Sequence, residues 1–467
     1  MKLNKLILIA IIVLASLLRL YKLGTMPALN ADEAAIGYNA YSLIQTGKDE
    51  HGNPWPIHFQ SFNDYKPGLY VYIVLPFVKI LGLNEWAVRF PGALLGVATV
   101  LVIYLLVKEL FKNERFAIIS ASLLAISPWH IHFSRGGWEV NVATFFITLG
   151  LWLFIRSANN KLSSWPLTLS VLSFIAALYT YHAARVIVPL LAVFLIVKYR
   201  NEIKANLKRT LPVVIAGAIV LLPLAIDFTR GGAFARAAGA GLFADPGPLS
   251  RVEEQRGEHD NFAGLTAKIF HNKPVNYFLA FAKNLADHFS GEFIFLSGDV
   301  IQRNRVPETG QVYLIELVFI AVSLVAIAKN SKGWGVIFWW LVIAPTAAAL
   351  TFQAPHALRA ANMVLPLTIV CAYGLTKLVT WLQKKNLKFG FWVLGFAIAW
   401  SFMRYAHMYW VHMAKEYPYS SQYGLKELVS YVKENESKYR KILVTNRYDQ
   451  PYVLFLFYMK YDPARFQ

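Results

Sequence analysis

The polar stretch between the first two apolar runs, residues 20–66, holds the side chains best suited to chemistry. It carries five carboxylates, and two of them, Asp32 and Glu33, are adjacent at the start of a predicted helix. Asn30 can cap this helix, an apolar stripe follows it, and Gly47 ends it. The peptide dipole favours ionised acids at a helix N-terminus. Either this stretch holds a reacting carboxylate, or it is a capped amphipathic helix on a membrane surface with merely solvated acids.

Three short loops repeat a second pattern, in which a His is followed three residues later by an Arg. The pairs are His132 with Arg135, His182 with Arg185, and His356 with Arg359; a further arginine is Arg89. Residues three apart share a helical face, and guanidinium groups bind phosphate through forked, charge-assisted hydrogen bonds. If the four arginines converge, they form a seat for a lipid-linked phosphate. Alternatively, each extends to lipid headgroups or pairs with a loop carboxylate.

Three other residues are candidates with weaker signals. Lys66 follows Asp64 where the chain returns to apolar sequence, so it can hold a phosphate, balance a catalytic carboxylate, or simply anchor the chain at an interface. Asp299 follows a glycine, which is also ordinary turn chemistry. We assign Asp64, Asp299 and the three histidines to substrate binding. No metal-ligand spacing or nucleotide-binding glycine loop is present in the sequence, so no metal site is assigned and a divalent cation stays an open alternative.

Composition places the chain among all-α polytopic membrane proteins. Of its 467 residues, 56% are hydrophobic and only 16% are charged, whereas soluble domains have about a quarter charged. The apolar residues gather into runs near the length that crosses a bilayer. Eleven spans are predicted: 6–18, 90–111, 116–133, 140–155, 165–181, 186–197, 211–228, 312–328, 334–352, 360–382 and 389–410. The net charge of +19 follows membrane sidedness, so nucleic acid is not an expected partner.

The distribution of basic residues predicts the topology. If the ambiguous stretch 69–83 does not cross the membrane, the N-terminus and five later loops lie on the same side. Together they contain sixteen Lys and Arg residues and only two acidic residues. The positive-inside rule makes that side cytoplasmic. The stretch 69–83 then lies along the outer face or dips into it, and the loops 20–89 and 229–311 are external. We therefore expect a multi-pass cell-membrane protein with a cytoplasmic N-terminus and extracytoplasmic catalytic loops.

The chain changes character after residue 410. Residues 417–440 are predicted to be an exposed helix, and residues 441–445 (KILVT) a short strand. One strand and one helix do not bury a core, so residues 411–467 are expected to be the truncated start of a soluble extracytoplasmic α/β domain, beside a transmembrane domain over residues 1–410.

Several segments carry a family resemblance. They read PALNADEAAIGYNA, DYKPGLYVY, NEWAVRFPGALLG, SPWHIHFSRGGWEVN and PHALRAANMVLP. With these segments the chain resembles, from residue 1 to about 410, the polyprenyl-phosphate-dependent GT-C glycosyltransferases, specifically the protein O-mannosyltransferases and the aminoarabinose lipid A transferases. The resemblance implies a GT-C fold of eleven to thirteen helices, interfacial helices in the first loop, and a sugar donor on dolichyl or undecaprenyl phosphate.

The resemblance also implies roles for individual residues. Asp32 would be the general base for an acceptor hydroxyl, and Lys66 would contact the donor phosphate. Our hypothesis adds Glu33 to the catalytic set, inversion at the anomeric carbon, and the four arginines as further contacts of the donor phosphate. The KP segment differs from the lipid A pattern and no β-trefoil domain is present in the sequence, so protein, lipid and glycan acceptors stay open. The alternative is a lipid or sugar transporter, but this sequence lacks the internal repeats and mid-membrane charges typical of one.

Overall fold

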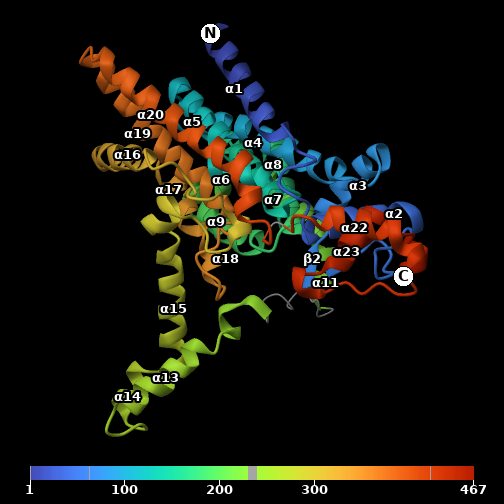
Figure 1. Cartoon of the computed structure of the whole chain (residues 1–467). Helices are drawn as coiled ribbons and strands as arrows, with labels where there is room; N and C mark the ends of the chain where they lie inside the picture. Colours follow the sequence, from blue (N-terminus) through green and yellow to red (C-terminus); the bar gives the residue numbers. More distant parts are fainter. Residues whose placement is uncertain (1, 63, 230–238, 421) are drawn as a thin grey trace.

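The computed structural model describes residues 2–62, 64–229, 239–420 and 422–467 and consists almost entirely of helices (Figure 1). Residues 230–238 of the predicted external loop 229–311 lie outside the described residues. The main helices of the body are α1 (Lys2–Leu20), α4 (Glu85–Phe111), α5 (Glu114–Ile126), α6 (Pro128–Ser134), α7 (Glu139–Ala158), α8 (Ser164–Thr180), α9 (Ala184–Lys198), α11 (Leu207–Thr229), α16 (Glu316–Lys329), α17 (Gly335–Ile343), α19 (Val364–Lys384) and α20 (Lys388–His407).

Each of the eleven predicted apolar runs overlaps at least one of these helices; run 116–133 covers the bent pair α5 and α6, and run 334–352 covers α17 and the short helix over residues 346–349. By length and composition, six of the described helices can cross a membrane, or seven when α5 and α6, bent by 59°, are counted as one span. The others are shorter than the roughly 20 residues that a perpendicular crossing requires. The architecture is therefore that of a multi-pass membrane protein, while the number of eleven spans stays a prediction.

The buried core lies between α4, α5, α7 and α19. Helix α7 packs against both α4 and α8, while α19 packs against α5 and α16. At one crossing Gly374 of α19 lies directly against the Phe319 carbonyl of α16, where an added Cβ would overlap the carbonyl oxygen. The close approach of these backbones therefore requires a glycine.

The segment between α1 and α4 folds into α2 (Ala31–Thr46), an antiparallel hairpin of β1 (His58–Ser61) and β2 (Asp64–Pro67), and α3 (Leu69–Leu81). Helix α2 has the predicted ends: Asn30 forms a capping box with Glu33, and Gly47 ends the helix at a φ of 72°. The hairpin was not predicted. Helix α3 is the ambiguous apolar stretch, and its place along the outer membrane surface stays a prediction.

The C-terminal residues pack around α2. They form α22 (Leu425–Asn435), α23 (Pro451–Met459) and α24 (Pro463–Phe466), with α2, α22 and α23 sharing one hydrophobic cluster. The strand predicted at residues 441–445 is wrong: this segment is irregular, and Leu443 is 82% exposed. A strand requires a neighbouring strand for its backbone groups, and none of the described residues supplies one. The described part of the predicted α/β segment is thus helical; its role as the start of a larger domain stays a prediction.

The shorter elements complete the chain. In the second long loop, α13 (Gly247–Gly257), α14 (Leu265–Phe270) and α15 (Lys273–Asp287) project away from the helical body (Figure 1). The remaining short helices are α10 (Arg200–Ala205), η2 (Leu242–Ala244), η3 (Glu292–Leu296), η4 (Gln302–Asn304), α18 (Thr346–Ala349), η5 (Ala361–Met363), η6 (Met408–His412), α21 (Met413–Glu416), η7 (Glu436–Lys438) and η8 (Asn446–Tyr448).

The contact between α23 and α2 yields a prediction about stability. Phe457 is 1% exposed, and a Cβ added to Gly37 would lie 2.6 Å from its ring. Phe457→Ala should therefore open a cavity and lower the free energy of unfolding by about 3–5 kcal/mol, measured as a lower Tm in detergent. Leu443→Ala, at an exposed position, is the matched control. Equal Tm values for the two variants would contradict this packing role.

Candidate functional site

The two adjacent carboxylates of α2 lie in opposite environments. Glu33 is fully buried and forms a two-pronged ion pair with Arg89 of α4, with Nε–Oε1 and Nη2–Oε2 distances of 2.6 and 2.7 Å. The backbone N–H of Gly137 also donates to Oε1 at 2.7 Å, and the side-chain amide of Asn30 donates to Oε2 at 3.0 Å. The Glu33 carboxylate is thus fully engaged in structural contacts, so the geometry adds no support to its predicted place in the catalytic set, which stays a prediction.

Asp32 points towards the surface, with 24% of its side chain exposed. Its Oδ1 forms an ion pair with Nζ of Lys66 on β2, and Nη1 of Arg303 lies 3.8 Å from its Oδ2. Successive residues of an α-helix are rotated by about 100°, which is why one acid of the pair is buried while the other is accessible. The structure therefore brings together one carboxylate and two cations from three separate elements.

Arg303 was not predicted from the sequence. Several residues that were predicted as site residues instead contact the segment that carries Arg303. The ring Nε2 of His132 donates to the Arg303 carbonyl at 2.9 Å. Asp299 accepts the backbone N–H groups of Ile301 and Ala357 at 2.9 and 2.6 Å, and Nδ1 of His356 lies 3.6 Å from Asp299. His132, Asp299 and His356 thus support the turn that carries Arg303. The only local signal was the proximity of Arg303 to Asp299 in sequence.

A second group of predicted residues supports the hairpin that carries Lys66. Nδ1 of His58 on β1 is hydrogen-bonded to Asp227 of α11, and Nη2 of Arg185 on α9 donates to the other ring nitrogen of His58. Arg185 also donates to Nδ1 of His182 at 3.2 Å. Burial is the main cause that lowers the pKa of His58, and the charge of Arg185 lowers it further. A neutral His58 ring fits these contacts, because one ring nitrogen can accept from Arg185 while the other donates to Asp227. Asp64 precedes Lys66 by two residues on β2, on the same face of the strand.

The buried arginines Arg89 and Arg135 bind backbone carbonyls rather than facing a shared anion site. All five polar contacts of Arg135 are internal: four carbonyls between Leu18 and Met26, at 2.6–3.2 Å, and the hydroxyl of Tyr409 at 3.2 Å. Arg89 donates to the carbonyls of Leu23, Pro27 and Ala28 at 2.8–3.0 Å. Both guanidinium groups therefore hold the connection between α1 and α2. The structure therefore gives no support to the predicted phosphate-binding role of these two residues, which stays a prediction.

Arg359 occupies a third location. It donates to Oγ1 of Thr351 at 2.8 Å and to Oε1 of Gln353 at 3.2 Å, within the loop that follows α18. The four predicted arginines thus lie in three different places: Arg89 and Arg135 at the connection between α1 and α2, Arg185 at His58, and Arg359 after α18. The cations beside Asp32 are Lys66 and Arg303.

Glu50, an acid near Lys66, has a raised pKa. Glu50 is buried after α2, and burial raises its pKa to about 7, while a hydrogen bond from Asn39 and the charge of Lys66 act in the opposite direction. Among the residues that the structure describes, there is no group of three or more His, Cys, Asp or Glu side chains that could hold a metal ion. The open alternative of a divalent cation therefore gains no ligand set from these residues.

Sequence comparison finds a family match in the first half of the chain. Residues 65–226 match the family described as dolichyl-phosphate-mannose-protein mannosyltransferase. Dolichyl-phosphooligosaccharide-protein glycotransferase 2 of Archaeoglobus fulgidus is 27% identical over 136 residues, which cover 24% of this chain and 23% of that protein. A protein of Aquifex aeolicus described only as uncharacterized is 30% identical over 145 residues, covering 31% and 28%. The matched segments thus make up about a quarter of the length of these relatives.

Solved structures extend the likeness to almost the whole chain. The oligosaccharyltransferase AglB from Archaeoglobus fulgidus, in complex with an inhibitory peptide and a dolichol-phosphate, has a TM-score of 0.55 at 14% identity over 95% of this chain and 60% of its own. ArnT from Cupriavidus metallidurans bound to undecaprenyl phosphate has a TM-score of 0.54 at 12% identity, covering 96% and 75%. The chain has the GT-C fold. The predicted resemblance to GT-C glycosyltransferases is confirmed.

The family match and the site overlap only in part. In this GT-C chain the matched range 65–226 includes Lys66 but neither Asp32 nor Arg303. The family match therefore includes only Lys66 of the three charged residues at the site. Asp32 and Arg303 are brought beside it by tertiary contacts.

The contrast between the two acids of α2 yields a second prediction. Glu33→Gln leaves the buried guanidinium of Arg89 without its counter-charge, so the free energy of unfolding should fall by about 3–5 kcal/mol. Asp32→Asn removes an accessible partner, which should cost no more than about 1 kcal/mol. Tm measurements on both purified variants test the difference. A Glu33→Gln variant as stable as Asp32→Asn would refute the structural role of Glu33.

Proposed function

We propose that this chain is a membrane glycosyltransferase that moves a single sugar from a polyprenyl-phosphate donor to an acceptor hydroxyl. The observation that carries the proposal is the accessible carboxylate of Asp32 between the cations Lys66 and Arg303. A base and two phosphate-binding cations are the groups that such a transfer requires. The GT-C fold and the polyprenyl phosphates bound in the ArnT and AglB structures support this donor class.

In the proposed step, the acceptor hydroxyl oxygen attacks the anomeric carbon and its proton passes to the Asp32 carboxylate. The bond between that carbon and the donor phosphate oxygen breaks, and the polyprenyl phosphate leaves with the electron pair. Attack opposite to the leaving group inverts the anomeric configuration. The charge that grows on the phosphate is stabilised by Lys66 and Arg303, because charge-assisted hydrogen bonds are strong in a site partly closed to water.

The same proposal covers the sidedness and the acceptor. We place the site on the extracytoplasmic face because the opposite helix ends carry the basic loops, with the N-terminus in the cytoplasm. Protein, lipid and glycan hydroxyls all fit the chemistry of Asp32. Arg303 replaces Arg89 and Arg135 in the proposed phosphate site, and Arg185 and Arg359 are assigned no direct contact with the donor.

Removal of the base should abolish most of the activity. Asp32→Asn should lower turnover by about 10²–10⁴ while the protein stays folded, because the side chain is accessible and keeps its size. The measurement is transfer of sugar from purified polyprenyl-phosphate donors to candidate acceptors, detected by mass spectrometry. Asp287→Asn, in an exposed pair on α15, is the matched control. Normal turnover by Asp32→Asn would eliminate the proposed base, and donor uptake without any transfer product would favour the transporter alternative.

Removal of either cation should weaken binding of the donor but not of the acceptor. Lys66→Gln and Arg303→Gln should each raise the KM for the donor by about 10–100-fold, since each removes a hydrogen bond from a charged donor to phosphate. The KM for the acceptor should change much less. Lys283→Gln on α15 is the matched loss of a positive charge outside the site. Equal changes in both KM values would argue against a phosphate-binding role.

A further inference from the structure

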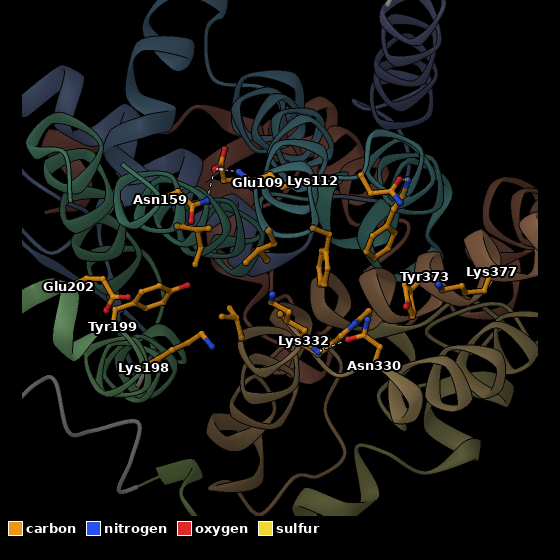
Figure 2. Close-up of a pocket in the computed structure, with 18 residues that line it drawn as sticks. Glu109, Lys112, Asn159, Lys198, Tyr199, Glu202, Asn330, Lys332, Tyr373 and Lys377 are labelled. Carbon is orange, nitrogen blue, oxygen red and sulfur yellow. Dashed lines mark hydrogen bonds and ion pairs between the residues drawn. The ribbon is translucent and has the colours of Figure 1, made fainter. Parts of the chain in front are cut away.

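A second polar region lies at the opposite ends of the helices from Asp32. It is a cavity of about 700 Å³ bounded by residues from α4, α5, α7, α9, α17 and α19. Figure 2 shows the lining residues as sticks, with Glu109, Lys112 and Asn159 near one another and Lys198, Tyr199 and Glu202 on a different side of the cavity. Four of the lining residues are lysines: Lys112, Lys198, Lys332 and Lys377.

The cavity is separate from the proposed catalytic site. Helix α4 carries Arg89 near its first turn and the cavity residues Glu109, Leu110 and Phe111 at its end. At a rise of about 1.5 Å per residue, these positions are roughly 30 Å apart along the helix. The cavity lies among the basic loops that the positive-inside rule assigns to the cytoplasmic face.

The charges around the cavity are unevenly balanced. Lys112 forms an ion pair with Glu109 at 2.6 Å, and Asn159 donates to the same carboxylate oxygen at 2.6 Å. The other three lining lysines, Lys198, Lys332 and Lys377, are accompanied by only one further lining carboxylate, that of Glu202. The lining residues therefore carry a net charge that an anion would neutralise.

Lys198 lies in a position that an anion would stabilise. Its Nζ is 3.8 Å from the point where a Cβ on Gly335 would stand, and Gly335 is the first residue of α17, whose N-terminus has no side-chain cap. The N-terminus of a helix carries partial positive charge, so a cation beside it is unfavourable. An anion between Lys198 and α17 would interact favourably with both.

The floor of the cavity is aromatic. Phe111, Phe116, Trp334 and Tyr373 form one cluster with neighbouring ring centroids 4.8–5.4 Å apart for the pairs 111–334, 111–116, 116–373 and 334–373. Phe116 and Trp334 are only 1% and 2% exposed, so the apolar surface that the cluster offers to the cavity comes mainly from the partly buried Phe111 and Tyr373. Lysines around such a surface suit a ligand with a charged headgroup attached to an apolar body. A phosphate ester at the membrane surface has this character.

We propose that this cavity binds the phosphate group of an anionic phospholipid from the leaflet on the side of the basic loops. The phosphate lies between Lys198, Lys332 and the start of α17, and the glycerol and acyl part lies over the aromatic floor. A soluble phosphate would satisfy the same cations, but it would leave the aromatic floor unused. The site is independent of sugar transfer and requires no conclusion about the activity.

Lipid retention by the full chain tests this proposal. The wild type, Lys198→Gln/Lys332→Gln, and the matched control Lys384→Gln/Lys385→Gln are placed in nanodiscs of mixed phosphatidylglycerol and phosphatidylcholine, and bound lipid is measured by native mass spectrometry. A lysine that contacts an anionic headgroup at the membrane surface contributes about fivefold to lipid binding, and the control measures the loss caused by surface charge outside the cavity. The cavity variant should therefore lose phosphatidylglycerol retention by roughly 25-fold, while the control, whose lysines do not line the cavity, retains it.

A second arm identifies the source of the phosphate. In lipid-free detergent, the Tm of each protein is followed against inorganic phosphate and short-chain phosphatidylglycerol. A wild-type shift with the lipid alone, lost in the cavity variant, supports a lipid site; a shift with inorganic phosphate that the variant loses supports a phosphate site with a soluble ligand. Equal retention and equal shifts in wild type and cavity variant, or an equal loss in the control, would overturn the proposal.

Discussion

The ion pair between Glu33 and Arg89 is the interaction on which the geometry of the candidate site depends. Both side chains are fully buried, and the removal of two charges from water is favourable only when their hydrogen bonds are complete. Here they are: Glu33 also accepts from the backbone of Gly137, and Arg89 also donates to three carbonyls. The pair fixes α2 against α4 and the start of α7. Asp32, one residue before Glu33, is thereby held at the surface of the same helix end.

Buried arginines play a related role along the connection between α1 and α2. A carbonyl that is buried without a partner is costly, and this connection is irregular, so its carbonyls lack helical donors. A planar guanidinium with five donors can satisfy several of them at once. Arg135 and Arg89 do so from α6–α7 and from α4. The cations at this end of the helices are thus mostly structural, and the two that lie beside Asp32 are Lys66 and Arg303, the cations of the proposed phosphate site.

The polar groups of this GT-C chain concentrate at both ends of its helices. At one end a carboxylate and two cations come from α2, β2 and η4; at the other, lysines and an uncapped helix start surround an aromatic floor. Between them α4 is a nearly uniform apolar helix. This separation follows from the cost of placing charges in hydrocarbon, and it keeps the proposed reacting site and the proposed lipid site on opposite faces.

The sequence by itself determined the elements whose causes are local: the apolar helices, the N-cap at Asn30, the helix end at Gly47, and the GT-C resemblance. It also identified Asp32 and Lys66 as candidates, but it did not separate the roles of Asp32 and Glu33. It missed the hairpin and Arg303, and it predicted a strand at 441–445 that no neighbouring strand among the described residues supports. Those features were decided only by the tertiary structure, because burial, ion pairing and strand pairing depend on partners distant in the chain, as Arg303 is from Asp32, and no local pattern encodes them.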